Sequence, residues 1–325
     1  MGEFRLIPYK VESVTNHAEK IPEGVKMIKA QEIWEESRKG SGVVVAIIDT
    51  GCQPDHPDLK DRIIGGKNFT NQGNDNDFSD QNGHGTHVAG TIAAAVNHSG
   101  VVGVAPEANL LILKVLDSEG NGTTQGIIDA INYAVSWKGT NGQKVRVINM
   151  SLGGRYDDPR LHDAVKNAVS NDILVVCAAG NEGDPWEGGD CSPKKDEFSY
   201  PGAYNEVVEI GAIGLDRKFP CFTNTNKEVD LVAPGVNILS TFPQSMQGGY
   251  ATLSGTSMAA PHVSGAAALL INKCEKEFGR TLTEPEIYAQ LVKYTSDLGY
   301  DKRIEGNGLL NLAGECFAPS DIASI

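Results

Sequence analysis

Four runs of apolar, largely β-branched residues limit what this chain can fold into more than any other feature. They are VVVAII at 43–48, LLILKV at 110–115, VRVINM at 145–150 and ILVVCAA at 173–179. A run without polar alternation is typical of a strand that is buried on both faces. Because helical patterns lie between the runs, we predict a single-domain α/β fold with a mostly parallel central sheet covered by helices on both faces.

Four segments show the spacing of apolar residues expected for helices. They are TQGIIDAINYAVSW at 124–137, PRLHDAVKNAVSN at 159–171, SMAAPHVSGAAALLINKC at 257–274 and TEPEIYAQLVKYTS at 283–296. The segment at 257–274 is apolar on nearly every face, which predicts a buried helix. Further strands are expected near 206–212 and 229–232.

Charge and hydropathy exclude several classes of partner. The chain has 28 basic and 42 acidic residues, a net charge of −14, so nucleic acid and anionic membranes are poor partners. No stretch approaches the ~20 apolar residues that span a bilayer. The N-terminus lacks the apolar core of a secretory leader, so we expect a cytoplasmic protein whose six cysteines are free thiols.

Three polar residues follow the predicted strands or begin the buried helix. Asp49 comes directly after the first apolar run, His84 stands between glycines at a helix start, and Ser257 opens the buried helix. Each alone has a plain structural explanation, since Asp and Ser commonly cap helices and turns. His84 and His87 are spaced as a metal pair, but no third ligand motif accompanies them.

Taken together, the three residues suit nucleophilic catalysis. A serine hydroxyl needs a base, an imidazole can be that base, and a carboxylate can orient the imidazole. Ligands of open α/β sheets bind at the carboxyl ends of the strands, which is where Asp49 is expected. An esterase of the α/β-hydrolase type would need G-x-S-x-G and the order Ser…Asp…His, so GTSMA and the order Asp…His…Ser exclude it.

The chain resembles the subtilisin-like serine proteases over roughly residues 18–315. The motifs that carry the resemblance are AIIDTG, NGHGTHVAGTI, VVGVAP, NMSLGG, AAGNEG, VAPG and SGTSMAAPHVSGAAALL, in that order. FRLIPY near the start and DTGCQPDHPDL make it most similar to the intracellular subtilisins of bacilli. The resemblance implies an intracellular endopeptidase of broad specificity that cleaves extended polypeptides through an acyl-enzyme.

The resemblance also assigns site residues. Ser257 would be the nucleophile, His84 the general base and acid, Asp49 the orienting carboxylate, and Asn181 a donor of the oxyanion hole. The substrate would lie as an added strand between two walls, one of Gly120, Asn121 and Gly122 and the other of Ser151, Leu152, Gly153 and Gly154. Ala178, Ala179, Gly180 and part of the 151–154 strand would line the first specificity pocket, with Glu182 at its rim. A binding protein on a dead protease scaffold is the alternative, and the intact set Asp49, His84, Ser257 and Asn181 argues against it.

Calcium is expected from the resemblance as a structural ion at one or two sites. One site would use Asp58 with the loop AAVNHSGVVG, which is one residue shorter than in secreted members. The other would use carbonyls near Gly202, Tyr204 and Val207, with Asp230 nearby. The segment GNDNDFSDQNG at 73–83 lacks the EF-hand spacing and is interpreted as a polar surface loop. The insertion at 184–198 leaves the detailed substrate preference open.

The segment FRLIPYKVES has the composition of a bound peptide. We predict three parts: an inhibitory extension at 1–17, a peptidase domain at 18–317 and a tail at 318–325. Leu6, Ile7 and Tyr9 would enter pockets, while Pro8 would hold the nearest carbonyl out of line with Ser257 because its ring fixes φ. The expected partners are polypeptide substrates and the chain's own extension. A homodimer with a second copy is also expected, although the sequence itself does not give the oligomeric state.

Overall fold

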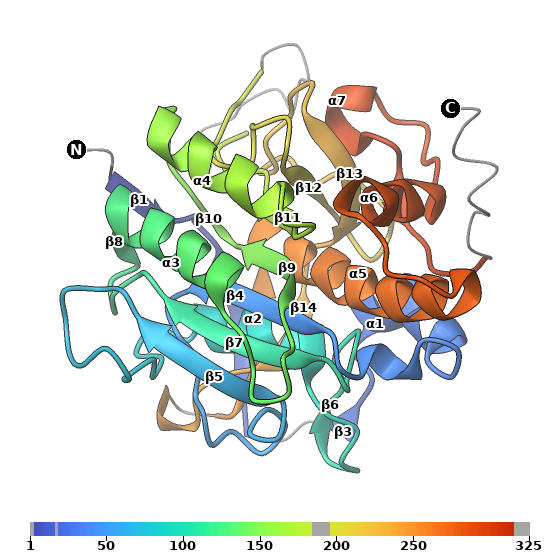
Figure 1. Cartoon of the computed structure of the whole chain (residues 1–325). Coiled ribbons are helices and arrows are strands. Elements are labelled where there is room, and N and C mark those ends of the chain that lie inside the picture. The colour runs from blue at the N-terminus through green and yellow to red at the C-terminus, as the bar shows by residue number, and fades with distance from the viewer. Residues whose placement is uncertain (1–2, 17–18, 184–195, 247, 315–325) are drawn as a thin grey trace.

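The computed structural model describes residues 3–16, 19–183, 196–246 and 248–314. Its centre is a nine-stranded sheet in the order β16-β17-β13-β12-β11-β9-β4-β7-β5 (Figure 1). All neighbours pair in parallel except β16 and β17. The strands are β4 (Val44–Asp49), β5 (Ile63–Asn68), β7 (Asn109–Lys114), β9 (Val145–Met150), β11 (Leu174–Ala178), β12 (Val208–Ile213), β13 (Val229–Pro234), β16 (Thr295–Ser296) and β17 (Leu309–Leu310).

Helices cover both faces of this sheet, as the sequence predicts. The two longest on one face are α3 (Thr124–Ser136) and α4 (Pro159–Val169), which lie side by side in Figure 1. The other face carries α2 (His84–Ala93), the long α5 (Thr256–Phe278) and α6 (Glu284–Lys293). The short helices are α1 (Glu23–Met27), η1 (Ala30–Ile33), η2 (Arg38–Gly40), η3 (Gln244–Met246) and α7 (Lys302–Glu305).

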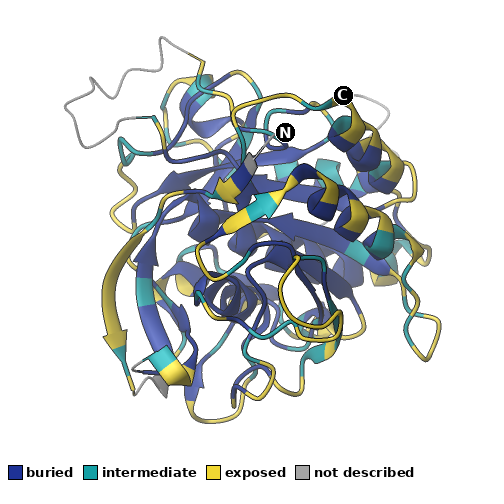
Figure 2. Cartoon of the chain, turned by 90° about the vertical axis from the view of Figure 1, so that its left-hand side faces the viewer, coloured by how far each residue is buried: buried dark blue, intermediate teal, exposed yellow. Residues whose placement is uncertain are grey.

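Helix α5 is the centre of the core. It is buried from Thr256 to Cys274, which confirms the prediction from its apolar faces. In Figure 2 the central sheet and inner helices are mostly dark blue, while exposed residues lie on the outer sides of the peripheral helices, in loops and along one strand at the edge of the molecule. This rigid interior fixes the ends of β4 and α5, where the candidate residues stand.

The first residues of the chain form strands of three small sheets. β1 (Glu3–Leu6) lies between β10 (Leu152–Gly153) and β8 (Asn121–Thr123). β2 (Lys10–Thr15) extends a sheet that also contains β14 (Ile238–Thr241) and β15 (Tyr250–Ser254). β3 (Glu19–Lys20) then pairs with β6 (Gly100–Val101). The N-terminal segment is thus bound along its length by residues far away in sequence.

The cysteines differ in part from the expectation of six free thiols. Cys52 and Cys177 are free and buried. Cys221 and Cys274 each take part in a disulfide bond, so the expectation is wrong for these two. Disulfide pairing depends on proximity in the fold, which the spacing of cysteines along the sequence does not give. Cys191 and Cys316, like the tail at 318–325 and most of the insertion at 184–198, lie outside the described residues.

Candidate active site

The ends of β4 and α2 bring Asp49 and His84 together. Nδ1 of His84 lies 2.8 Å from Oδ1 and 3.0 Å from Oδ2 of Asp49, and both side chains are fully buried. The backbone N–H of Thr50 also donates to Oδ1 of Asp49. This geometry leaves Nε2 of His84 as the nitrogen that faces away from the carboxylate.

Ser257 stands in the first turn of α5 and is not hydrogen-bonded to this pair. Its hydroxyl donates to the carbonyl of Ser151 at 3.3 Å, and the hydroxyl of Ser151 donates back to the carbonyl of Ser257 at 3.1 Å. Nε2 of His84 is buried and has no hydrogen-bond partner among the described residues. The predicted base and carboxylate are therefore paired, but the predicted nucleophile and base are not hydrogen-bonded to each other.

Asn181 is held with its amide N–H aimed at the N-terminal segment. Its Oδ1 accepts from the backbone N–H and the hydroxyl of Thr256, at 2.9 and 2.8 Å. These two bonds fix which end of the amide is free, and Nδ2 donates to the carbonyl of Pro8 at 2.5 Å. The predicted oxyanion donor thus already binds a peptide carbonyl.

The two predicted substrate walls enclose β1. Arg5 is opposite Gly153 and Leu6 is opposite Leu152 on one side. On the other side Arg5 is opposite Asn121, and Leu6 donates its N–H to the carbonyl of Gly120 at 2.9 Å. The remaining members of the walls are in place as well, since Gly122 is opposite Phe4, and a Cβ built on Gly154 would lie 3.1 Å from Cε1 of Phe4.

Side chains of the N-terminal segment fill the site to different degrees. Phe4 and Ile7 are each 2% exposed, whereas Leu6 is partly buried and Pro8 is exposed. A Cβ built on Gly153 would lie 3.4 Å from Cγ1 of Ile7, so Ile7 packs against the predicted pocket wall. Phe4 is not among the residues that the sequence predicts to bind, although it is as buried as Ile7.

Tyr9 covers the candidate base. Its ring lies 4.9 Å from the imidazole of His84 at an interplanar angle of 53°, and its hydroxyl donates to Oδ1 of Asn82. Burial and the charges of Asp80 and Asp49 raise the pKa of Tyr9 to about 12. The ring is therefore neutral where it shields His84.

The predicted pocket residues lie where the walls meet α5. Ala178 and Ala179 are buried, and the N–H of Gly180 donates to the hydroxyl of Thr256. Glu182 is exposed, and Asn224 binds it through two hydrogen bonds, from Nδ2 to the carboxylate and from the Glu182 N–H to Oδ1 of Asn224. A carboxylate at the predicted rim is thus held in one orientation.

Sequence reasoning missed two charged residues that support the pair. Asp80 is buried and accepts hydrogen bonds from Thr50, Thr86 and the backbone of the loop before His84. Lys114, at the end of β7, donates from Nζ to the carbonyl of Thr50. The segment at 73–83 is largely exposed, as predicted for a surface loop, but Asp80 within it is an exception. The signal for Asp80 is its position four residues before His84, where a carboxylate suits a helix start.

The imidazole of His87 does not face His84. Its Nε2 lies 3.0 Å from the carbonyl of Ile238, and burial lowers its pKa to about 3. The described residues contain no group of three or more His, Cys, Asp and Glu that could hold a metal ion.

The carboxylates predicted to bind calcium are held by protein donors. Asp58 accepts from Nδ2 of Asn97 and from the N–H of Val101. Asp230 accepts from the N–H of Glu209 and the hydroxyl of Tyr288, and burial raises its pKa to about 6. Gly202, Tyr204 and Val207 lie in consecutive turns, where the N–H of Tyr204 donates to the carbonyl of Pro201 and the N–H of Val207 to that of Tyr204. Calcium binding therefore stays a prediction from the resemblance.

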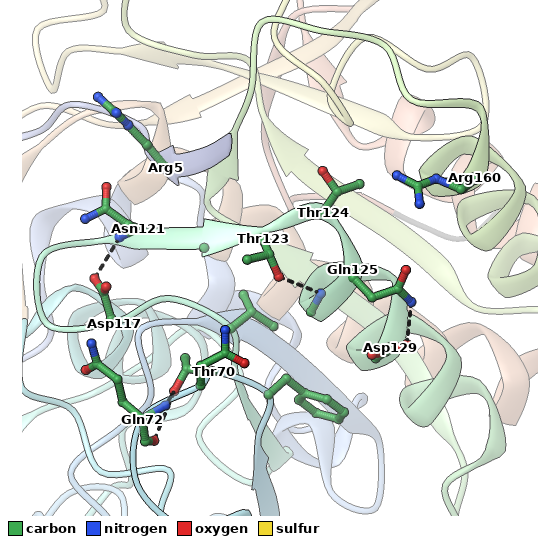
Figure 3. A pocket seen from close by; sticks show the side chains of 15 residues that line it. Arg5, Thr70, Gln72, Asp117, Asn121, Thr123, Thr124, Gln125, Asp129 and Arg160 are labelled. Carbon is green, nitrogen blue, oxygen red and sulfur yellow. Dashed lines mark hydrogen bonds between the residues drawn. The ribbon is translucent and has the colours of Figure 1, made fainter. Parts of the chain in front are cut away.

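The pocket in Figure 3, about 860 Å³ in volume, lies beside the site rather than in it. It is lined by Arg5 of β1, Asn121 of β8 and Gln125 of α3, among others, and by none of Asp49, His84 and Ser257. This is expected where the cleft between the two walls is already filled by the N-terminal segment.

Comparison with known proteins places these residues in a family context. The family model described as "Subtilase family" matches residues 40–314. An intracellular serine protease of Paenibacillus polymyxa is 57% identical over 95% of this chain and 91% of its own length. The major intracellular serine protease of Bacillus subtilis is 53% identical over 99% of this chain and 96% of its own length. Subtilisin DY of Bacillus licheniformis is 40% identical over 91% of this chain and 98% of its own length. Among the residues discussed above, the N-terminal segment lies outside the range that the family model matches.

Proposed function

This chain belongs to the subtilase family and is a serine endopeptidase. From this premise we propose that it acts inside the cell and cleaves extended polypeptides with broad specificity. We further propose that it is made as a precursor whose active site is blocked by its own N-terminal extension. The observation that supports the blocked state is the bond from Nδ2 of Asn181 to the carbonyl of Pro8, beside the buried pair of Asp49 and His84. The relatives named as intracellular serine proteases support the location.

In the proposed mechanism Ser257 attacks the substrate carbonyl as His84 takes the hydroxyl proton on Nε2. Asp49 keeps the other nitrogen protonated and stabilises the imidazolium that forms. The carbonyl oxygen becomes negative in the tetrahedral intermediate, where Nδ2 of Asn181 and the N–H of Ser257 donate to it. His84 then returns the proton to the leaving amine, and water releases the acyl group by the same route.

The extension is proposed to block the site through a mismatch of one residue. In a productive complex, the residue that fills the first pocket also supplies the carbonyl that Asn181 binds. Here Ile7 packs against the pocket wall, but Asn181 binds the carbonyl of Pro8. The carbonyl of Ile7, which a substrate's pocket residue would present to Asn181, is therefore not the carbonyl that Asn181 binds. In addition, the ring of Tyr9 lies against the imidazole of His84. Ser257 is left bonded to Ser151 instead of to its base.

The test compares initial rates of peptide hydrolysis by the full chain and by a chain that begins near Glu19, before any self-processing. The proposal expects the shorter chain to be the faster by at least about tenfold, which is the effect of roughly 1.4 kcal/mol of tethered binding. A fluorophosphonate that labels active serines reports the number of live sites in both. Equal rates per molecule would contradict the block, and absence of labelling in the shorter chain would contradict the catalytic assignment.

Calcium and self-association complete the proposal. An ion that binds only the native state stabilises it by an amount that grows with its concentration. We expect millimolar calcium to raise the melting temperature relative to a chelator, and an unchanged melting temperature would contradict both predicted sites.

The proposed homodimer is tested by light scattering, which reports the mass of the particle in solution and should give twice the mass of one chain.

A further inference from the structure

We propose that the pair Asn121–Gly122, in one of the two substrate walls, is a site of spontaneous deamidation. The N-terminal extension protects this site, which becomes reactive when the extension leaves, so that the active enzyme loses substrate binding as it ages. The protection by the extension rests on the proposed function, whereas the reactivity of the pair does not.

Deamidation at an Asn–Gly pair needs only the protein's own backbone and water. The glycine nitrogen loses its proton and forms a bond to Cγ of the asparagine, while the bond from Cγ to Nδ2 breaks and ammonia leaves. Water then opens the resulting succinimide at either carbonyl, which gives aspartate or isoaspartate. Glycine favours the reaction because it has no Cβ to hinder the attack and its backbone is permissive.

The chain contains four such pairs, at 82–83, 121–122, 141–142 and 307–308. Their side chains are held to different degrees. Nδ2 of Asn82 and Nδ2 of Asn307 each donate to a backbone carbonyl, at 3.0 and 2.9 Å. Asn121 is exposed, and its Nδ2 makes a long hydrogen bond of 3.4 Å to the exposed carboxylate of Glu119. Asn141 lies in an exposed turn. The pair in the wall is therefore among the less firmly held of the four.

The N–H that would attack points toward the extension. The N–H of Leu6 donates to the carbonyl of Gly120, and alternate residues of an antiparallel strand face the same neighbour, so Gly122 faces β1 as well. Gly122 is opposite Phe4 in this pairing. Ring closure also requires rotation about the Cα–C bond of Asn121, away from the extended conformation. With β1 in place the wall resists that rotation, and without β1 this edge of β8 is unpaired.

Packing requires the glycine that makes the pair labile. A Cβ built on Gly122 would lie 2.6 Å from Cδ2 of Leu116 and 2.7 Å from the carbonyl oxygen of Val115, closer than real side chains pack. The pocket in Figure 3 is lined by both Asn121 and Gly122, so water reaches the pair. The wall thus keeps a reactive pair next to solvent.

Each product changes the wall in its own way. Isoaspartate adds a methylene to the backbone before Gly122, which shifts the N–H that pairs with the substrate out of register. Aspartate keeps the backbone but adds a negative charge beside Glu119. Isoaspartate should therefore be the more damaging product.

The first test compares two states of the full-length protein. In one, Ser257→Ala keeps the extension uncut. In the other, the unaltered chain has processed itself, has been separated from the freed extension by gel filtration and has been labelled by a fluorophosphonate, which prevents further cutting. Peptide mapping by mass spectrometry and enzymatic methylation of isoaspartate follow deamidation in both during incubation. Asn141 is the matched internal control.

Deamidation at Asn121 should be at least about tenfold slower in Ser257→Ala, because the site reacts in the fraction of molecules whose extension is detached. Asn141 should react equally in the two states. Equal rates at Asn121, or no reaction there while Asn141 reacts, would overturn the proposal. A difference at Asn141 as large as that at Asn121 would do so too. Absence of fluorophosphonate labelling would instead contradict the proposed function.

The second test follows activity during ageing of the processed enzyme, with kcat/KM expressed per site that a fluorophosphonate labels. As isoaspartate accumulates, kcat/KM should fall by about two- to tenfold, the effect of one lost backbone hydrogen bond. Asn121→Gln closes the corresponding larger ring far more slowly, so this variant should keep its own starting value of kcat/KM. An equal decline in both proteins would overturn the link between deamidation and loss of substrate binding.

Discussion

β1 and β2 belong to the same short segment, but the protein holds them in different ways. β1 lies between two strands, and Phe4 within it and Ile7 directly after it are both almost fully buried. β2 pairs with one strand only and leaves nearly every side chain in solvent. The comparison teaches that buried side chains help to hold β1, whereas β2 is held mainly through its backbone.

The largest expected effect is that of replacing the predicted nucleophile. Ser257→Ala should lower kcat for peptide hydrolysis by up to about 10⁶-fold, a loss known for subtilisin itself. The same variant leaves the extension uncut, so hydrogen exchange can then compare the amides of β1 and β2 directly. Near-native activity of the purified variant would place the nucleophile elsewhere.

A smaller effect is expected from a side chain of β1. Ile7→Ala removes buried apolar surface that holds the extension, and truncations of buried Ile cost about 2–5 kcal/mol in protein cores. The initial rate of the full chain should rise at least about tenfold, since about 1.4 kcal/mol is a factor of ten. If the rate stays that of the unaltered chain, side-chain burial does not hold β1.

Tyr9, between the strands, should make the block sensitive to alkaline pH. Its pKa is raised to about 12 in the bound segment from an ordinary value of 10, so bound Tyr9 keeps its proton where free Tyr9 loses it. Its contribution to the block is complete below pH 10 and is lost as the pH rises toward 12. Fluorophosphonate labelling of the full chain should therefore increase across this range. Tyr9→Phe cannot ionise and is the control, and a parallel increase in that variant would assign the effect to another group.

The smallest effect is expected in β2. Val14→Ala trims a side chain that is already 39% exposed and leaves the backbone ladder intact. The initial rate should change by less than about twofold, because exposed substitutions usually shift free energies by no more than about 0.5 kcal/mol. An increase as large as that of Ile7→Ala would remove the distinction between the two strands.

The central sheet and the buried helix can be predicted because local patterns carry them. The apolar run before Asp49 and the largely apolar faces of α5 each specify an environment without reference to distant residues. The candidate residues Asp49, His84, Ser257 and Asn181 are likewise identified from motifs; the fold pairs Asp49 with His84 and binds Asn181 to Thr256, the residue before Ser257. These are features in which local sequence and global structure agree.

Other features depend on contacts that no local pattern contains. Lys10 meets Ser254 across most of the length of the chain, and the pairing uses backbone groups that every residue has. Asp80 belongs by its sequence to a polar loop, because its burial comes from Thr50 and Thr86, which lie on other segments. The disulfide bonds of Cys221 and Cys274 depend in the same way on the tertiary fold.

The division of the extension into two paired strands has a consequence for activation. A cut beyond β2 would end the covalent link, but the freed piece would still be bound through both strands as a separate peptide. Its rebinding would then depend on the concentration of protein, whereas before the cut it did not. Activation would therefore proceed in two stages, a cleavage followed by a dissociation, and dilution would hasten only the second.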